Sequence, residues 1–467
     1  MQIVGKKIDL QSHRRTSRRN GRLSNSNYSN IMTNTEQISE IFKLPIELLY
    51  SIFDYIDVQT IIFSLRHTCR QFRDIVKWYD RYVLDFDLIS MYRLRYICRL
   101  IRPDSVISLK LSDDVKTPKQ IEYFLSLINI RRFTQLHSLT ITQDSEDLFN
   151  SIFDHVINCH SFVSFSIYFR PSPPFKHPDF RDYDLTGPTL GPLASVIAQS
   201  NLTIFKTNLR SYQLDKILSP IQYSFQHLTI GNCTRKQYYM ILRHSPHLQT
   251  IVMEHFKRKQ NQAIHDSESE ENDQFVYDFY HPLTSLTLLE HQGSIFDLEK
   301  SLSLTPTLMH LKIIGDISDT IFFMDSSRLE EFIRSKLCSL KHFEIFINGS
   351  TNSENLSIDM LIEPFRTSFW IEEKHWFFTC EFLLRLQKFI FYSTPIPTIN
   401  ANYYFGFEKI STSTFDKPNM HTQMMNGVRH LHFSLWDMTY FNFQEVCTSC
   451  KNKQHFIIDQ KKQRSNF

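Results

Sequence analysis

The chain has 467 residues, of which 42% are hydrophobic and 22% are charged, and its 52 Lys and Arg nearly balance its 49 Asp and Glu. This apolar content excludes a disordered chain, the length exceeds what one compact domain usually holds, and the small net charge excludes a broad nucleic-acid-binding surface. Eight scattered Cys, no apolar run that could span a bilayer, and a basic N-terminus without a secretory signal predict buried free thiols, a cytoplasmic or nuclear location and no membrane partner.

Residues 1–40 are rich in Ser, Asn, Arg and Gln and contain too few apolar residues to pack, so they are predicted to form a disordered basic arm. The arm carries seven Lys and Arg against three Asp and Glu, a formal charge of 7 − 3 = +4. The cluster from Arg14 to Arg19 is compatible with a nuclear import signal or an RNA-contacting arm. A solvated tail is the simpler interpretation, and we expect no nucleic-acid partner.

Residues 41–80 are predicted to form a unit of three short amphipathic helices. The first apolar stripe starts at Leu44, and Pro45 suits a first helical turn because its missing N–H would have no partner there. Asp57 is placed to cap the second helix, and the third stripe starts at Cys69. Such a small unit buries little apolar area, so we expect it to complete its core against another protein. Packing only against its own C-terminal domain is the alternative.

The same residues resemble a known interaction motif. Residues 44–57 read LPIELLYSIFDYID and residues 65–72 read LRHTCRQF, and their order and spacing resemble the F-box. Two positions depart from the family pattern, with Thr68 where Val is usual and Phe72 where Trp is usual. The resemblance implies that the unit docks on a Skp-family adaptor and, through it, on a cullin-based ubiquitin ligase. The residues that it places in or behind the docking face are Leu44, Pro45, Leu48, Ile52, Leu65, Cys69 and Phe72.

Residues 81–445 alternate short strand-like runs with helical stripes. The runs share a pattern of apolar residues at the first, fourth and sixth positions, with Thr207 at the sixth position of the run at Leu202. Helical stripes precede several runs, such as Ile121 to Ile128 before the run at Leu136. Helix-then-strand units that recur every 23 to 46 residues predict an α/β fold with a parallel sheet lined by helices. The runs begin at Val106, Leu136, Phe162, Leu202, Phe225, Leu248, Leu283, Leu308, Leu340, Leu386 and Val428.

This pattern resembles a divergent leucine-rich-repeat horseshoe, an irregular solenoid, followed by a C-terminal tail over residues 446–467. That family holds Asn or Cys at the ninth position, which Cys233 and Asn348 fit. Asp114, Asp144 and Asp316 are chemically tolerable there, whereas the other six of the eleven runs carry another type of residue. A compact α/β domain with a mixed sheet is the alternative. The resemblance places residues between the apolar strand positions, here the fifth residues of nine runs, on a concave target-binding surface. These residues are Lys110, Thr140, Ser166, Lys206, Thr229, Thr287, Lys312, Glu344 and His432.

The sequence contains few residue patterns that indicate catalysis or the binding of a metal or cofactor. The Pro-rich residues 171–192 and the charge-segregated residues 257–273 are predicted to be surface loops. Cys447 and Cys450 form a single C-x-x-C pair, whereas a structural zinc needs four converging ligands. Because Gly-rich phosphate loops and hydrolase motifs are also missing from the sequence, we expect no metal, no cofactor and no catalytic residue.

Together these features favour a non-catalytic substrate-recognition adaptor of a cullin-based ubiquitin ligase. Its N-terminal helices would hold the Skp-family adaptor, and its repeat domain would hold an unknown target protein. A protein-interaction scaffold that does not engage the ligase is the alternative.

Overall fold

The computed structural model describes residues 44–114, 116–143, 152–153, 155–156, 161–169, 187–199, 201–218, 222–257, 279–291, 295–317, 326–350, 358–384, 386, 388–394, 400–402, 409–414, 430–434 and 455–459. The predicted arm, the loop 258–273 and the Cys447–Cys450 pair lie outside these residues. The chain divides into two compact units between Tyr79 and Asp80.

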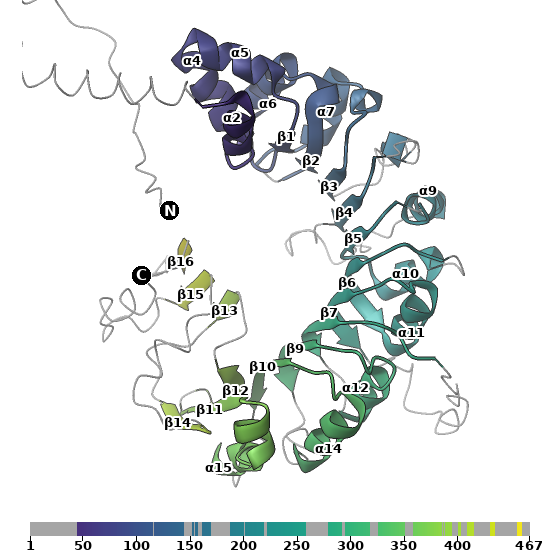
Figure 1. The fold of residues 1–467 in the computed structure, drawn as a ribbon, viewed down its shortest axis with the longest axis vertical. Helices are drawn as coiled ribbons and strands as arrows, with labels where there is room; N and C mark the ends of the chain where they lie inside the picture. The colour runs from purple at the N-terminus through teal and green to yellow at the C-terminus, as the bar shows by residue number, and fades with distance from the viewer. Residues whose placement is uncertain are drawn as a thin grey trace, which may run out of the picture. The chain divides into compact units, whose positions relative to one another are not determined.

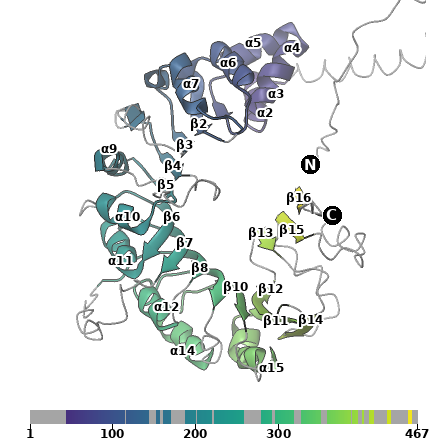
Figure 2. The ribbon, with the colours of Figure 1, turned by 180° about the vertical axis from the view of Figure 1, so that it is seen from behind.

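The first unit contains the three predicted helices (Figure 2). The first is α2 (Ile46–Phe53), and the third is α5 (Arg70–Trp78). The second is composite, because α3 (Val58–Thr60), the π-helical turn η1 (Ile61–Leu65) and α4 (Arg66–Thr68) follow one another without a break. Their buried side chains are apolar and come from all three helices. They are Leu49, Phe53, Val58, Ile61, Ile62, Phe72, Val76 and Tyr79.

The second unit is built on a 13-stranded sheet in which the first ten strands lie in chain order and pair in parallel (Figure 1). These strands are β1 (Tyr82–Asp85), β2 (Val106–Ser112), β3 (Ser138–Gln143), β4 (Ser164–Phe169), β5 (Ile204–Thr207), β6 (His227–Thr234), β7 (Thr250–Lys257), β8 (Ser285–His291), β9 (His310–Ile317) and β10 (His342–Ser350). The predicted parallel sheet is therefore confirmed over the runs from Val106 to Leu340, and β1 adds a strand that the sequence pattern did not predict.

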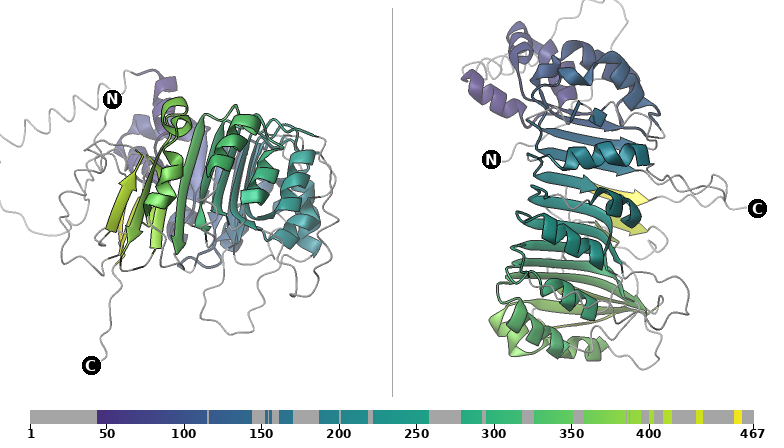
Figure 3. Two further views of the ribbon diagram at one scale, coloured as in Figure 1. Left: turned by 90° about the horizontal axis from the view of Figure 1, so that it is seen from below. Right: turned by 90° about the vertical axis from the view of Figure 1, so that its right-hand side faces the viewer.

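The helices lie along one face of this sheet (Figure 3). Those predicted from apolar stripes are α7 (Gln120–Leu127), α11 (Arg235–His244) and α14 (Ser326–Lys336). The others are α6 (Met91–Leu100), α9 (Gly187–Ile197), α10 (Ser211–Ile217), α12 (Ile295–Leu302) and α15 (Ile358–Ile362). Because helices cover this face, the side chains that point toward it are apolar.

The register of the strands follows the apolar pattern of the sequence. Ser108 pairs with Ser138, and the chain of pairs continues at the third position of every run as far as His342 on β10. In the nine runs from Val106 to Leu340, the residues at the first, fourth and sixth positions are all at most 4% exposed. Register and burial agree because a one-residue slip would move every apolar side chain to the other face.

Residues 187–192 correct the prediction of a loop over 171–192, because they open α9. Pro188 lies in the first turn, where a missing N–H costs nothing, and Pro192 follows one turn later. Leu190, Leu193 and Val196 are buried on one side of the helix. This apolar face explains why the segment is helical despite its prolines.

The last two predicted runs depart from the parallel array. The run at Leu386 corresponds to β12 (Lys388–Thr394), which pairs antiparallel with β10 and with β11 (Phe377–Leu383). Only residues 384–387 connect β11 to β12, and a parallel crossover needs about a dozen or more residues. Strand β14 (Lys409–Ser413) pairs antiparallel with β11 and is the last strand of the sheet.

The run at Val428 belongs to a separate three-stranded parallel sheet. This sheet is formed by β13 (Asn400–Asn402), β15 (His430–Ser434) and β16 (His455–Asp459). Strand β16 falls in the predicted C-terminal tail. His432 pairs with Asn402 and Ile457, so it does not join the row of fifth-position residues in the large sheet.

An aromatic cluster fills the region where parallel pairing gives way to antiparallel pairing. Phe365 follows α15, and its ring centroid lies 4.8 Å from that of Phe378 on β11 and 4.9 Å from that of Phe391 on β12. Trp370, in the π-helical turn η6 (Phe369–Glu373), is fully buried beside Phe365 and Phe378. These four large rings therefore close the core beyond β10.

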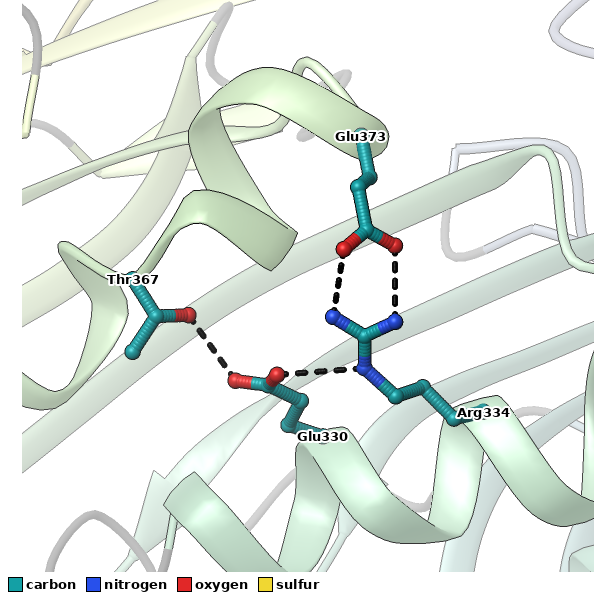
Figure 4. A network of polar contacts seen from close by, with 4 residues as sticks. All are labelled: Glu330, Arg334, Thr367 and Glu373. Carbon is teal, nitrogen blue, oxygen red and sulfur yellow. Dashed lines mark hydrogen bonds and ion pairs between the residues drawn. The ribbon is translucent and has the colours of Figure 1, made fainter.

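A polar clasp holds η6 against α14 (Figure 4). The Arg334 guanidinium donates two hydrogen bonds to the Glu373 carboxylate and a third, of 3.2 Å, to Glu330. Thr367 donates to the second oxygen of Glu330 at 2.8 Å, and the guanidinium carbon lies 4.4 Å from the Phe369 ring centroid. Bidentate and stacked contacts of this kind need the planar guanidinium, so Lys at this position would not replace them.

Gly349 provides a test of the β10–β12 junction. A Cβ atom at this position would clash with the Phe389 ring on the paired strand. We expect Gly349→Ala to lower the free energy of unfolding by about 2 kcal/mol. Adding Phe389→Leu removes the atoms that clash, so the double variant should lose less than the sum of the two single changes in urea unfolding. Strict additivity would contradict this account.

His281 gives the stability of the second unit a pH dependence. Burial lowers the pKa of its imidazole, although the hydrogen bond of Nε2 to the Ser245 carbonyl, 2.8 Å, raises it. Its Nδ1 is buried without a partner, so protonation would bury an unpaired N–H. The folded state then binds fewer protons than the unfolded state, and this contribution to stability is present above the ordinary pKa of about 6.5 and lost as the pH falls below it.

We therefore expect the apparent melting temperature of the wild-type chain to fall between neutral pH and about pH 5. His281→Gln should be less stable at neutral pH and should show a shallower decline. An unchanged slope in the variant would assign the pH dependence to other groups, such as His155, whose pKa burial also lowers.

Candidate functional site

The first helix of the N-terminal unit leaves one apolar side uncovered. Leu44 is 36% exposed, Leu48 51%, Ile52 44% and Tyr55 94%. Leu48 and Ile52 lie four positions apart on one side of α2, whereas Leu44 precedes its N-cap residue and Tyr55 follows its C-cap residue. These four residues are called the α2 stripe below. Among the residues that the structure describes, no other helix, taken with the residues that flank it, exposes as many large apolar or aromatic side chains.

The opposite side of α2 is anchored in the core of the unit. Leu49 and Phe53 are buried, and the Phe53 ring centroid lies 5.5 Å from that of Tyr79 and 6.4 Å from that of Phe72. The Tyr79 hydroxyl donates a 2.7 Å hydrogen bond to Asp54. This bond ties the end of α2 to the residue that follows α5, so the stripe is presented from a fixed helix.

Pro45 determines where α2 starts. It is the N-cap residue, and its carbonyl accepts hydrogen bonds from the Leu48 and Leu49 amides at 3.1 and 3.2 Å. Glu47 adds a negative charge in the first turn, where the helix dipole favours it. Pro45 is itself exposed beside Leu44, so the Leu-Pro pair both starts the helix and extends its apolar side.

The remaining predicted docking residues lie deeper in the unit. Leu65 and Cys69 are half-buried, and Phe72 is buried in the core. The Cys69 sulfur accepts a hydrogen bond from the Phe72 amide at 3.5 Å and caps α5. Phe72 therefore lies behind the face and supports it. Leu44, Pro45, Leu48 and Ile52 are the exposed members of the predicted set.

Thr68, the other departure from the family pattern, forms a hydrogen bond through its hydroxyl to the preceding turn of the helix. Its Oγ1 donates to the Ser64 carbonyl at 3.1 Å, at the end of the π-helical turn η1. Such back-bonding is typical where a helix bends or widens, and π-helical turns are frequent at functional sites. The hydroxyl therefore has a partner within its own helix.

Three exposed apolar or aromatic side chains of the first unit were not predicted. They are Ile46, Tyr55 and Trp78. Tyr55 follows Ile52 by three positions, so the helical spacing could have revealed it. Ile46 and Trp78 lie at helix ends, where the spacing does not determine exposure.

A second candidate site is the uncovered face of the large sheet. The fifth residues of the runs pair in register across the strands, from Lys110 with Thr140 to Lys312 with Glu344. This fifth-position row also contains Val252, which the sequence analysis did not name. Its members in strand order are Lys110, Thr140, Ser166, Lys206, Thr229, Val252, Thr287, Lys312 and Glu344.

Charges at the two ends of the row are paired within the chain. Lys110 contacts Asp85 at 3.1 Å and Asp87 at 3.2 Å, and Lys312 contacts Glu344 at 2.9 Å. Burial alone would lower the pKa of Lys110, but its hydrogen bonds to the two carboxylates outweigh burial and raise that pKa. These ammonium groups are therefore largely committed to internal partners.

Carboxylates reappear on this side of the chain at β7 and β8. His255 and Glu290 pair in register, and the His255 Nδ1 lies 2.7 Å from a Glu290 oxygen. Burial raises the pKa of Glu254. The neighbouring His255 opposes this shift, and the negative charge of Glu290 adds to it. Within the described residues, no group of three His, Cys, Asp or Glu side chains is arranged to hold a metal ion.

Comparison with known protein families identifies one domain in the chain. Residues 41–84 match the F-box domain family, in agreement with the resemblance seen in the sequence. No curated protein matches the chain. None of the helices in the described ranges has the length and apolar character needed to cross a bilayer.

Asp57 tests how the docking unit is held together. Its carboxylate accepts hydrogen bonds from the Thr60 amide at 2.8 Å and the Thr60 hydroxyl at 2.7 Å, which caps the composite second helix. Asp57→Ala should destabilise this helix by about 1 kcal/mol, so the amides of residues 61–65 should exchange with solvent about fivefold faster. Asp57→Asn keeps a capping oxygen and should exchange nearly as the wild type does. Equal effects of the two variants would rule out capping by Asp57.

Proposed function

We propose that the chain is a substrate-recognition adaptor of a cullin-based, SCF-type ubiquitin ligase. The F-box match over residues 41–84 supports a role in binding a Skp-family adaptor. The observation that carries the proposal is the α2 stripe, an apolar surface on a helix whose other side is already packed. In this proposal the cullin is reached through the adaptor and not by direct contact.

The stripe has the chemistry of the centre of a protein interface. Fully burying an exposed aliphatic side chain contributes roughly 1.5–3 kcal/mol. Leu44, Leu48 and Ile52 are 36–51% exposed, so each can add a third to a half of that gain on docking. A stable interface buries about 1,200 Å² or more in total, which exceeds what one helix face offers. We therefore assign the half-buried Leu65 and the exposed Trp78 to the surrounding contacts.

The second unit is proposed to hold the target protein as a divergent leucine-rich-repeat domain. Its support is the stacking of helix–strand units in chain order and the burial of the first, fourth and sixth positions. The ninth-position Cys233, which fits that repeat, is also buried. The antiparallel strands β11, β12 and β14 would then be a cap on the last repeat.

In this role the chain performs no bond chemistry. Holding the target and the ligase on one chain raises the concentration of the target near the ubiquitin donor, and this effective concentration supplies the rate gain. The fifth-position row is proposed as the target-binding surface because its side chains are the part of the sheet that the helices leave uncovered.

The proposal predicts that Leu48→Ala with Ile52→Ala will abolish adaptor binding without unfolding the chain. Both side chains are about half exposed, so stability should change by less than about 0.5 kcal/mol each, while binding should weaken more than about tenfold. The measurement is co-purification of the full chain with a Skp-family adaptor, with thermal unfolding recorded in parallel.

The matched control removes two exposed apolar side chains from the second unit. Met360→Ala with Leu386→Ala deletes similar side chains far from α2 in the sequence and should leave adaptor binding unchanged. Adaptor binding that survives the α2 changes would contradict the assignment of the α2 stripe as the docking face. A wild-type chain that does not bind would leave a scaffold outside the ligase as the better description.

A further inference from the structure

The fifth-position row contains three lysines, and they differ in what they contact. Lys110 is paired with Asp85 and Asp87, and Lys312 is paired with Glu344. Lys206 on β5 is exposed, and the described part of the chain contributes no carboxylate to it. Within the described ranges, Lys206 is therefore the one lysine of the row that has no carboxylate partner.

The strands around Lys206 are free of acidic residues. Strands β2 to β6 contain no Asp or Glu, so the nearest strands with carboxylates are β1, where Asp85 is already paired with Lys110, and β7. In register, Lys206 lies between Ser166 on β4 and Thr229 on β6. Of these two neighbours, Ser166 is buried and hydrogen-bonds the Tyr168 side chain, whereas Thr229 is half-exposed, so the Thr229 hydroxyl is the one placed to donate a hydrogen bond to an anion.

The backbone that carries Lys206 is fixed. The Asn208 amide accepts a 2.8 Å hydrogen bond from the Phe169 N–H and donates a 2.6 Å hydrogen bond to the Phe169 carbonyl. This pair of bonds joins the ends of β4 and β5 just beyond their last paired residues, Ile167 and Thr207. A short strand held at its end presents its lysine with little backbone freedom to lose on binding.

Resting on the proposed function, we propose that Lys206 receives the carboxylate of an Asp or Glu side chain from the target protein. The target segment would cross β4, β5 and β6, with the carboxylate between the Ser166 and Thr229 positions. One ammonium with neutral hydroxyl neighbours matches one negative charge, whereas phosphate recognition in proteins typically uses clusters of arginines. Strands β4 to β6 contain no arginine.

The experiment uses the full chain held on an immobilised Skp-family adaptor. The probes are pools of short degenerate peptides that carry one fixed residue, either glutamate, glutamine, phosphoserine or lysine. We expect the glutamate pool to be retained above the glutamine pool. Lys206→Glu should weaken retention of the glutamate pool by about three- to tenfold and favour the lysine pool, because the charge at the site is reversed.

Lys236→Glu is the matched control. Lys236 is exposed on α11, away from the uncovered sheet face, and its replacement changes the net charge by the same amount. This variant should retain the peptide preferences of the wild type. A loss of the glutamate preference in both variants would make the effect one of total charge and would overturn the assignment to Lys206.

Carbodiimide coupling gives a second readout, since it joins a lysine to a carboxylate only where they touch. Lys110 to Asp85 and Lys312 to Glu344 serve as internal positive controls. A link between Lys206 and the fixed glutamate of the peptide would support the proposal. Equal retention of the glutamate and glutamine pools, or a preference for phosphoserine alone, would overturn it.

The two proposals fail in different ways. If the adaptor does not hold the chain, the ligase function fails, and the peptide pools are then compared on the chain immobilised through a terminal tag. If the adaptor holds the chain but Lys206→Glu leaves the glutamate preference unchanged, the assignment of Lys206 fails while the ligase function stands.

Discussion

The burial of apolar side chains on one side of each element is the constraint on which both units depend. In the large sheet, the fourth- and sixth-position residues point toward the helices and are removed from water, so the residues between them must face the other way. In α2, Leu49 and Phe53 are buried in the core of the first unit, so Leu48 and Ile52 on the other side of the helix face outward. Each candidate binding surface is thus the reverse side of a packed core.

Much of this arrangement could be predicted from the sequence because register and burial follow the same periodicity. The runs from Val106 to Leu340 contain enough apolar positions to fix which residue pairs with which across the sheet. The stripe of α2 was predictable for the same reason, and Tyr55 would have been found by extending the spacing one more turn. The burial of Phe72 in the core could not be predicted, because a helical stripe does not distinguish a residue in the core from one in an interface.

The strands after β10 depart from the parallel array for physical reasons that the apolar pattern of a single run does not reveal. Strand β12 carries the same apolar pattern as the parallel strands, and only the four-residue connection from β11 forces it to run the other way. Strand β11 was missed because its residues are buried on both faces, which removes the alternation that a strand prediction relies on. The ion pairs that distinguish Lys206 from Lys110 also depend on Asp85 and Asp87, which precede β2 and carry no signal of their own.

The position of the antiparallel cap has a consequence for how the domain can change in length. Strand β10 accepts a parallel neighbour on one side and an antiparallel neighbour on the other, so no further helix–strand unit can be added after it without displacing the cap. A duplicated unit inserted between β2 and β10 would meet suitable neighbours on both sides, because each unit packs mainly on the next. Gene duplication could therefore lengthen the binding surface from within while both ends of the domain stay the same.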